Sequence, residues 1–231
     1  MIFGGFQKTT LVDYPGKIAA TVFTLGCNFR CPYCHNLELV LPELIEKQPK
    51  ISEEEVLNFL KERKGLLEGL CITGGEPTLH YDLISFLEKV KSLGYLVKLD
   101  SNGSRPEILK ELFEKKLIDY LAMDVKTSLE KYHLVTLNQI PVEDILTSIK
   151  LIKDSGIDYE FRTTVAPEIV TKEDILKIVD LIKPARAYYL QIFKGIKTLD
   201  PRFTQLKGLD EEDLKDLIEQ IKPFFKECGI R

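Results

Sequence analysis

The sequence predicts an α/β fold, a partial (βα)6 TIM-like barrel with a parallel sheet that is open on one side. Short apolar stretches rich in β-branched residues alternate along the chain with longer stretches of helical period. Such alternation is typical of parallel strands joined by helices through right-handed crossovers. A complete eightfold barrel takes about 250 residues, and six strand–helix units already fill the 231 residues of this chain. We therefore expect three quarters of a barrel, with an open, doubly wound sheet as the alternative.

Each expected strand is a short run of apolar and β-branched residues, bounded by residues that favour turns. In chain order these runs cover residues 19–25, 69–73, 96–101, 120–125, 159–165 and 187–193. The C-terminal ends of parallel strands meet at one edge of the sheet, and ligands bind there in both barrels and open sheets. We therefore expect a functional site at that edge.

Each expected helix is a longer stretch in which apolar residues recur at helical spacing. These stretches cover residues 52–64, 81–93, 106–115, 142–155, 172–182 and 211–226. Ser52 stands before three glutamates, and Thr171 stands shortly before two acidic residues, as helix N-caps do. Gly94 and Gly156 follow predicted helices, where a residue of left-handed conformation commonly ends the helix.

Composition restricts the class of protein. Apolar residues make up 44% of the chain, and the net charge is −4, which gives no electrostatic reason to expect a nucleic-acid partner. No apolar run approaches the roughly 20 residues that cross a bilayer. Residues 1–10 lack the basic-then-apolar pattern of a signal peptide. We expect a single domain over residues 1–231, in the cytoplasm, with neither a membrane nor a nucleic-acid partner.

Three cysteines follow the first expected strand with the spacing C-x3-C-x2-C: Cys27, Cys31 and Cys34. They open a long loop, residues 27–50, and long loops of this kind are commonly functional. Three thiolates can hold three irons of a cubane iron–sulfur cluster, which leaves one iron open to a substrate. A structural zinc site of three cysteines and one histidine is the alternative. His35 would be an awkward fourth ligand, because it directly follows Cys34.

The remaining two cysteines have ordinary interpretations. Cys71 lies in an apolar expected strand, and we interpret it as a small buried side chain. Cys228 lies three residues before Arg231 and reads as a thiol in the C-terminal tail.

Polar residues also follow or interrupt other expected strands. Gly74 and Gly75 precede Glu76, and residues without side chains would let backbone carbonyls approach a ligand's ammonium group, although an ordinary turn is the alternative. Asp124 and Lys126 share one face of a strand, as an ion pair or as contacts to a charged ligand.

Arg162 interrupts another apolar strand. A buried arginine needs an anionic partner. A ligand carboxylate is one candidate, and Glu160, on the same face, is the competing one.

Together these residues resemble the radical S-adenosylmethionine superfamily. The cysteine spacing, with Tyr33 in the aromatic position, matches its cluster motif, and Gly-Gly-Glu-Pro at 74–77 matches its methionine-binding motif. Leu-Val-Asp-Tyr-Pro-Gly at 11–16 and Cys-His-Asn at 34–36 narrow the resemblance to the glycyl-radical-enzyme activating enzymes. Among these, the chain is most similar to the activating proteins of anaerobic ribonucleoside-triphosphate reductase that resemble pyruvate formate-lyase activating enzyme. Additional cysteine pairs for auxiliary clusters are absent from the sequence.

The resemblance implies an anaerobic activity, the reductive cleavage of S-adenosylmethionine at a [4Fe-4S] cluster. The product radical would remove a Cα hydrogen from a glycine of a partner glycyl radical enzyme. A low-potential donor such as flavodoxin or ferredoxin would supply the electron. Two other interpretations stay open: a radical enzyme acting on a small molecule, such as a deazaguanine-type ring-contracting enzyme, and a non-enzymatic, zinc-stapled binding module.

The resemblance also assigns roles to residues, none of them catalytic beyond the ligands of the cluster and cofactor. Cys27, Cys31 and Cys34 would bind the cluster. The residues placed at S-adenosylmethionine are Tyr33, Gly74, Gly75, Glu76, Ser101, Asn102, Asp124, Lys126, Arg162 and Gln191. Gln191 or a neighbouring residue would replace a relative's ligand-contacting histidine that this chain lacks. A monovalent cation would bind at Asp100, Ser101 and Asp124, and Asp13 would lie near the partner's loop.

Overall fold

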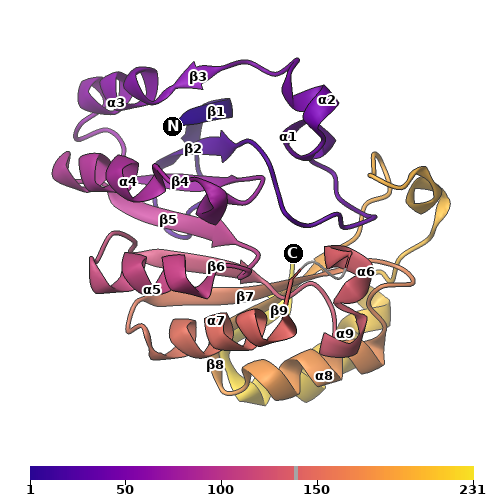
Figure 1. The fold of residues 1–231 in the computed structure, drawn as a ribbon. Coiled ribbons are helices and arrows are strands. Elements are labelled where there is room, and N and C mark those ends of the chain that lie inside the picture. Colours follow the sequence, from indigo (N-terminus) through magenta and orange to yellow (C-terminus); the bar gives the residue numbers. More distant parts are fainter. Residues whose placement is uncertain (138–139) are drawn as a thin grey trace. The chain divides into compact units, whose positions relative to one another are not determined.

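The computed structural model describes residues 1–137 and 140–231, which form an α/β fold (Figure 1). The chain divides into two compact units. Unit 1 comprises Met1–Asn28, Asn36–Ser101 and Glu107–Leu121, and unit 2 comprises Phe29–His35, Asn102–Pro106 and Ala122–Arg231. Strand β6 (Tyr120–Asp124) begins in unit 1 and ends in unit 2. The single domain expected over residues 1–231 stays a prediction.

Unit 1 contains a part of the sheet with both parallel and antiparallel pairings. Its strands follow the order β3 (Ile51–Ser52), β1 (Ile2–Thr10), β2 (Ala19–Thr24), β4 (Gly69–Gly74) and β5 (Leu96–Ser101). Strands β2, β4 and β5 are parallel, whereas β1 pairs antiparallel with both β2 and β3. The helices are α1 (Leu37–Val40), α2 (Pro42–Ile45), α3 (Glu53–Glu62), α4 (Leu83–Ser92) and most of α5 (Pro106–Glu114), and η1 (Pro77–Leu79) is a 3-10 turn.

The parallel strands of unit 1 are buried along most of their length. Leu70, Cys71 and Ile72 of β4 are fully buried, which confirms the interpretation of Cys71 as a buried side chain. Both faces of such strands are covered, so the strands are continuous apolar runs rather than alternating ones. Helix α4 contributes Leu83, Phe86, Leu87 and Val90 to this core, at the spacing of one helix face.

Unit 2 contains the other part of the sheet. Here β7 (Asp158–Val165), β8 (Ala185–Ile192) and β9 (Phe225–Ile230) are parallel neighbours. The helices are α6 (His133–Thr136), α7 (Val142–Asp154), α8 (Lys172–Ile182) and α9 (Glu211–Ile221), with 3-10 turns η2 (Leu129–Lys131), η3 (Pro201–Gln205) and η4 (Lys222–Phe224). The strand order ends at β3 on one side and at β9 on the other, so the mostly parallel sheet is not closed into a barrel.

The expected strands and helices are confirmed to within three residues at nearly every end. Ser52 caps α3 by accepting a hydrogen bond from the Glu55 backbone N–H, and Thr171 forms a capping box at α8. Gly94 and Gly156 have φ angles of +89° and +76°, as expected of residues that end helices.

Three strands were not predicted, and one predicted helix was too long. The expected helix 211–226 ends at Ile221 and gives way to η4, because Pro223 supplies no backbone donor to continue an α-helix. The chain then forms β9, which pairs parallel with β8. The interpretation of Cys228 as a tail thiol was therefore wrong. It lies half-buried in β9, where burial raises the pKa of its thiol to about 11.

Asp174 anchors the first turn of α8 and is expected to contribute measurably to stability. Its carboxylate accepts hydrogen bonds from Lys131 Nζ at 2.6 Å, from Ser128 Oγ at 2.7 Å and from the Thr171 backbone at 2.9 Å. Burial alone would raise its pKa, but these donors outweigh burial and lower the pKa from 3.8 to about 2. We expect Asp174→Asn to destabilise the protein by about 2 kcal/mol at pH 7, measured from the urea-unfolding midpoint.

The pH dependence of this effect has a defined sign. A carboxylate whose pKa is lowered by folding stabilises the protein above its unfolded pKa, and this contribution is lost as the pH falls through the folded pKa. The difference between Asp174→Asn and the unchanged protein should therefore persist above about pH 4 and shrink toward pH 2. Asp180→Asn is the matched control, since Asp180 lies on the same helix, is 69% exposed and forms an exposed ion pair with Lys183, three residues further on. An equal effect of both substitutions on stability would contradict the stabilising role assigned to the Asp174 carboxylate.

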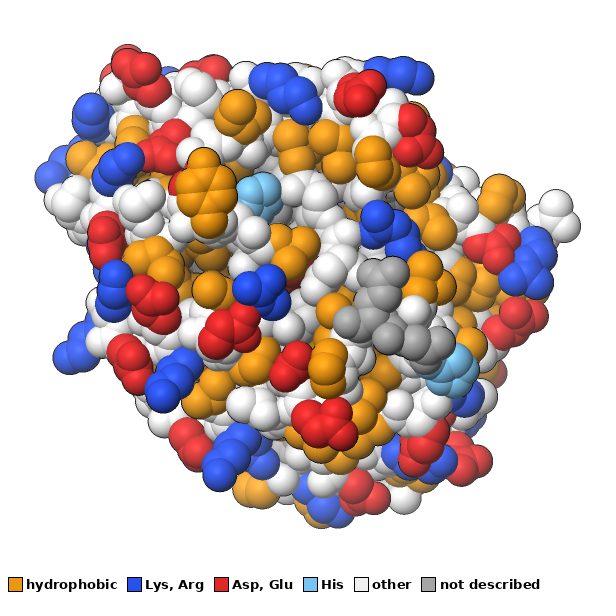
Figure 2. Space-filling view, viewed as in Figure 1, with side chains coloured by type: hydrophobic (Ala, Val, Ile, Leu, Met, Phe, Trp, Pro, Cys, Tyr) orange, Lys and Arg blue, Asp and Glu red, His pale blue; other side chains and the backbone are white. Residues whose placement is uncertain are grey.

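The surface carries both signs of charge. Figure 2 shows acidic and basic side chains interspersed over the visible face, with hydrophobic side chains between them. Among residues 1–137 and 140–231, no helix is both long and apolar enough to span a membrane.

Candidate functional site

The expected site residues divide between the two units. Unit 1 holds Asp13, Cys27, Gly74, Gly75, Glu76, Asp100 and Ser101. Unit 2 holds Cys31, Tyr33, Cys34, Asn102, Asp124, Lys126, Arg162 and Gln191. The structure brings residues together within each set. That the two sets form one site stays a prediction.

In unit 1, the end of β4 packs tightly against the chain that leads to Cys27. The Gly75 N–H donates to the Thr24 carbonyl at 2.9 Å, and the Glu76 N–H donates to the Gly26 carbonyl at 2.8 Å. A Cβ at Gly75 would lie 2.0 Å from the Gly26 carbonyl oxygen, so only glycine fits there. Gly74 has a φ of +110°, which also favours glycine. The two glycines therefore hold the start of the cysteine loop in place.

Glu76 is hydrogen-bonded to one other expected site residue of unit 1, Ser101. Its side chain is 1% exposed, and its Oε1 accepts hydrogen bonds from Ser101 Oγ at 2.9 Å and from Thr78 Oγ1 at 2.6 Å. Sequence reasoning missed Thr78, although an acidic residue two positions before it, at the start of a 3-10 turn, is a capping signal. These bonds fix the carboxylate at the C-terminal edge of β4 and β5.

A second polar group in unit 1 crosses three neighbouring strands. Lys98 is only 2% exposed, forms an ion pair with Asp100 and lies with its Nζ 3.8 Å from the Cys71 sulfur. Thr21 stands beside Cys71 in the sheet register, and its hydroxyl donates to Asp13 Oδ2 at 2.6 Å. Sequence reasoning missed Lys98, whose signal was a lone lysine in an apolar strand. Its ammonium group already neutralises part of the charge that the expected cation site would use.

In unit 2, the segment that carries Cys31 and Cys34 is held by a distant part of the chain. The Asp200 N–H donates to the Pro32 carbonyl at 2.9 Å, and the Leu199 N–H donates to the Cys34 carbonyl at 3.1 Å. Within the segment, the Cys34 N–H donates to the Cys31 carbonyl at 2.9 Å, which closes a turn. The residues around Leu199 therefore position the cysteines, and no local pattern in the sequence indicated this.

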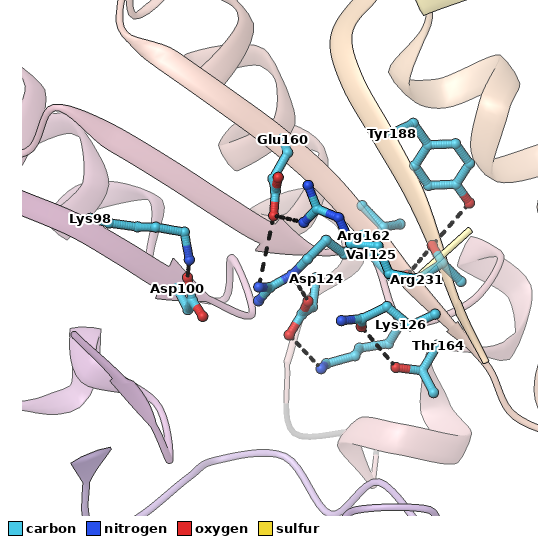
Figure 3. Close-up of polar contacts among 12 residues, drawn as sticks. Lys98, Asp100, Asp124, Val125, Lys126, Glu160, Arg162, Thr164, Tyr188 and Arg231 are labelled. Atoms are coloured by element: carbon cyan, nitrogen blue, oxygen red, sulfur yellow. Dashed lines mark hydrogen bonds and ion pairs between the residues drawn. The ribbon is translucent and has the colours of Figure 1, made fainter. Parts of the chain in front are cut away.

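Asp124 lies between two cations in unit 2 (Figure 3). Its Oδ2 accepts from Lys126 Nζ at 2.9 Å, and its Oδ1 accepts from Arg162 Nε at 2.8 Å. Burial alone would raise the pKa of Asp124, but the two positive charges lower it well below its usual range. Burial would lower the pKa of Lys126, but Asp124 raises it. All three groups are therefore charged at neutral pH.

The competing partner of Arg162 is placed differently. Glu160 Oε1 lies 3.9 Å from Arg162 Nη1 but accepts a hydrogen bond from Arg231 Nη1 at 2.9 Å (Figure 3). Asp124, rather than Glu160, is thus at hydrogen-bonding distance from Arg162. The structural ion pair that the sequence left open for Asp124 and Lys126 is present.

The other expected cofactor residues of unit 2 make local hydrogen bonds. Asn102 Oδ1 accepts from the Ser104 N–H at 2.9 Å, which forms a turn after β5. Gln191 Oε1 accepts from Thr164 Oγ1 at 3.2 Å across β7 and β8.

Tyr33 and Tyr132 place two buried hydroxyls near Cys31 in unit 2. Tyr33 is 5% exposed, and its hydroxyl has no hydrogen-bond partner among the described residues. Burial raises its pKa, and Cys31, Asp124 and Tyr132 raise it further. The Tyr132 hydroxyl accepts from the Lys126 N–H at 3.2 Å. Sequence reasoning missed Tyr132, because nothing in its local sequence distinguishes it from a core aromatic residue.

Comparison with known proteins identifies the family. Residues 21–182 match the radical SAM superfamily. The chain belongs to this superfamily. Members are enzymes that use a [4Fe-4S] cluster and S-adenosylmethionine, and these are the cofactors of this chain.

Individual relatives extend over most of the chain. A Methanocaldococcus jannaschii protein, whose name assigns it to the glycyl-radical enzyme activating enzymes, is 35% identical over 100% of this chain and 95% of its own length. Pyruvate formate-lyase-activating enzyme of Clostridium pasteurianum is 28% identical, with 94% of each chain covered. The 7-carboxy-7-deazaguanine synthase of Thermococcus kodakarensis is 25% identical over 75% of this chain and 69% of its own.

Solved structures agree in fold. Streptococcus suis SuiB bound to its precursor peptide superposes with a TM-score of 0.67 at 16% identity, over 90% of this chain and 47% of SuiB. This chain thus spans about half of SuiB. Escherichia coli QueE superposes with a TM-score of 0.56 at 14% identity, over 100% of this chain and 93% of QueE. Likeness at this identity shows a shared fold, an open and mostly parallel α/β sheet.

The residues present fit the cluster that the superfamily uses. Cys27, Cys31 and Cys34 are not joined in disulfide bonds, so their sulfur atoms can serve as thiolate ligands. Among the residues that the structure describes, no group of three or more His, Cys, Asp and Glu side chains converges as a single-ion site does. Thiolates of a cubane cluster each bind a different iron, so they need not converge on one point. The buried Tyr33 hydroxyl is a polar group that a bound cluster would help to satisfy.

Proposed function

We propose that this protein activates a glycyl radical enzyme, and that its partner is anaerobic ribonucleoside-triphosphate reductase. The observation that carries the proposal is the full-length similarity to the M. jannaschii relative, which the name of that protein places among such activating enzymes. The segments at 11–16 and 34–36 support the same class, because they resemble its motifs. A low-potential flavodoxin or ferredoxin is the proposed electron donor.

The chemistry divides between cofactor and protein. When bound, the cluster supplies the electron for reductive cleavage of S-adenosylmethionine. Cys27, Cys31 and Cys34 would hold it, and the protein would orient the cofactor and exclude water from the radical that forms. Asp124 carries a negative charge set between Lys126 and Arg162, an arrangement that can bind the opposite charges of an amino acid and the hydroxyls of a ribose.

The other proposed contacts follow the motifs. The methionine amino group would lie at Gly74, Gly75 and Glu76, and the methionine and ribose would contact Ser101, Asn102, Asp124 and Lys126. The Tyr33 backbone would lie near the adenine, Arg162 would face the ligand, and Gln191 would contact the adenosine. Asp13, held by Thr21, would lie near the glycine loop of the partner. A monovalent cation at Asp100, Ser101 and Asp124 would complete the site.

A second candidate function is radical chemistry on a small molecule of the deazaguanine type. The similarity to the T. kodakarensis synthase favours it, although at lower identity and over less of the chain. The two functions differ in where the unpaired electron ends, on a partner glycine or on a small-molecule product.

Anaerobic electron paramagnetic resonance tests the proposal. The reconstituted protein, reduced with flavodoxin or dithionite, is mixed with S-adenosylmethionine and anaerobic ribonucleoside-triphosphate reductase from the same organism. We expect a glycyl radical on the reductase, and none when its radical glycine is replaced by alanine. A radical formed only on pyruvate formate-lyase would identify a different partner. If no glycyl radical enzyme is activated while S-adenosylmethionine is still cleaved, the small-molecule function is favoured.

Asp124 is expected to contribute to cofactor affinity. Asp124→Ala removes the charge between Lys126 and Arg162, so S-adenosylmethionine should bind about 10-fold to 100-fold more weakly, as for a lost charge-assisted contact. Equilibrium dialysis of the reconstituted protein measures the affinity, and the iron content should stay unchanged. Asp158→Ala is the control, because it removes an exposed ion pair between Asp158, at the N-terminal end of β7, and Arg186. Unchanged affinity in Asp124→Ala would leave Asp124 a purely structural ion-pair partner.

A further inference from the structure

The Tyr33 hydroxyl is an unusual group in unit 2. Its side chain is only 5% exposed, and the hydroxyl lacks a hydrogen-bond partner among residues 1–137 and 140–231. Leaving a buried hydroxyl unsatisfied costs roughly 1–3 kcal/mol. Phenylalanine would fill the same volume without this cost. The hydroxyl is therefore expected to find an acceptor once the site holds its cofactors.

The surroundings of Tyr33 narrow the choice of acceptor. Cys31, Asp124 and Tyr132 are close enough to raise the pKa of its hydroxyl. Each carboxylate oxygen of Asp124 already accepts from a cation, Lys126 or Arg162. The Tyr132 hydroxyl already accepts from the Lys126 N–H.

Cys31 is the neighbour whose chemistry changes most when the cofactor binds. A thiol is a weak hydrogen-bond acceptor. A thiolate bound to iron carries negative charge and accepts hydrogen bonds well, and such bonds help to set the reduction potential of iron–sulfur clusters. Cys31 is among the neighbours that raise the pKa of the Tyr33 hydroxyl, and the hydroxyl makes no hydrogen bond to it among the described residues.

We propose that the Tyr33 hydroxyl donates a hydrogen bond to the Cys31 sulfur when that sulfur binds iron, and thereby raises the reduction potential of the cluster. Tyr33 is then a positioning and tuning residue through its side chain, in addition to any contact of its backbone. The inference rests on the cluster assignment of the proposed function, but it does not depend on the identity of the partner enzyme. The reduction potential is raised because reduction adds an electron to the cluster, and a hydrogen-bond donor stabilises the more negative state.

The midpoint potential of the reconstituted cluster, measured by redox titration monitored by electron paramagnetic resonance, tests the inference without any turnover. Tyr33→Phe should assemble the same cluster at a more negative potential, so that the reduced-to-oxidised ratio at a fixed potential falls several-fold. A tenfold fall corresponds to 59 mV for a one-electron couple. Tyr81→Phe is the matched control, because Tyr81 is 97% exposed, and its potential should equal that of the unchanged protein.

A second variant gives a shift of opposite sign. Site-specific replacement of Tyr33 by 3-fluorotyrosine keeps the hydroxyl and makes it a stronger donor, so the midpoint potential should become less negative. Equal potentials in the unchanged protein, Tyr33→Phe and the fluorotyrosine variant would overturn the inference while leaving the proposed function intact. Failure of the unchanged protein to assemble any iron–sulfur cluster would instead overturn the proposed function itself.

Discussion

Cys31→Ala is expected to abolish S-adenosylmethionine cleavage altogether. Cys31 is buried in unit 2, and its loss would leave two of the three proposed thiolate ligands. A site with two ligands cannot hold the cluster that must both bind the substrate and pass it an electron. Iron content of the anaerobically reconstituted protein should fall well below the value of about four per chain expected of a [4Fe-4S] site. Cleavage is measured as 5′-deoxyadenosine formed under dithionite.

Cys228→Ala provides the matched control for this substitution. Cys228 is a half-buried free thiol of β9 in the same unit, and no proposed role depends on it. Its iron content and cleavage rate should equal those of the unchanged protein. Cleavage that survives in Cys31→Ala would show that the cluster is held by other residues.

Gly75→Ala is expected to have the next largest effect. The added Cβ would lie 2.0 Å from the Gly26 carbonyl oxygen and 2.8 Å from its carbonyl carbon, so the backbone before Cys27 would have to move. Displacing a cluster ligand by about 1 Å can cost about 100-fold in rate. We expect S-adenosylmethionine cleavage to fall by about that factor, with partial loss of iron.

Gly65→Ala separates this clash from the general cost of replacing glycine. Gly65 also has a positive φ, +84°, but no atom lies within 4 Å of its would-be Cβ. Its substitution should cost about 1 kcal/mol of stability through backbone strain and leave cleavage unchanged. If Gly75→Ala and Gly65→Ala were equally active, close packing of β4 on the cysteine loop would not be required.

Most of the parallel sheet could be predicted from the sequence. Strands such as β4 and helices such as α8 can be predicted from residue type, spacing and capping residues, which are properties of neighbours along the chain. Strand β1, which lies between β3 and β2, was not predicted, because Gly4 and Gly5 interrupt its apolar pattern. It is held by antiparallel pairing with β2, which sequence spacing does not reveal.

In the candidate site, too, some features could be predicted from local sequence and others depend on tertiary contacts. The cysteine spacing and the Gly-Gly-Glu-Pro segment identified the superfamily, because the residue types and spacing of a short motif indicate which ligand it can bind. The motifs did not indicate that Gly75 supports Gly26, that Asp124 rather than Glu160 lies at hydrogen-bonding distance from Arg162, or that Tyr132 borders the site.

The sequence by itself thus determined the fold class, most elements of the sheet and the cofactor chemistry, since each depends on residue type and local spacing. Only the tertiary structure decided which partner each charge takes and which hydroxyl stays unsatisfied. Asp124 and Arg162 are 38 residues apart, and the Leu199 N–H reaches the Cys34 carbonyl across a far longer separation. Such contacts arise from the packing of distant strands and loops, where distance and burial, rather than sequence order, set the interaction energy.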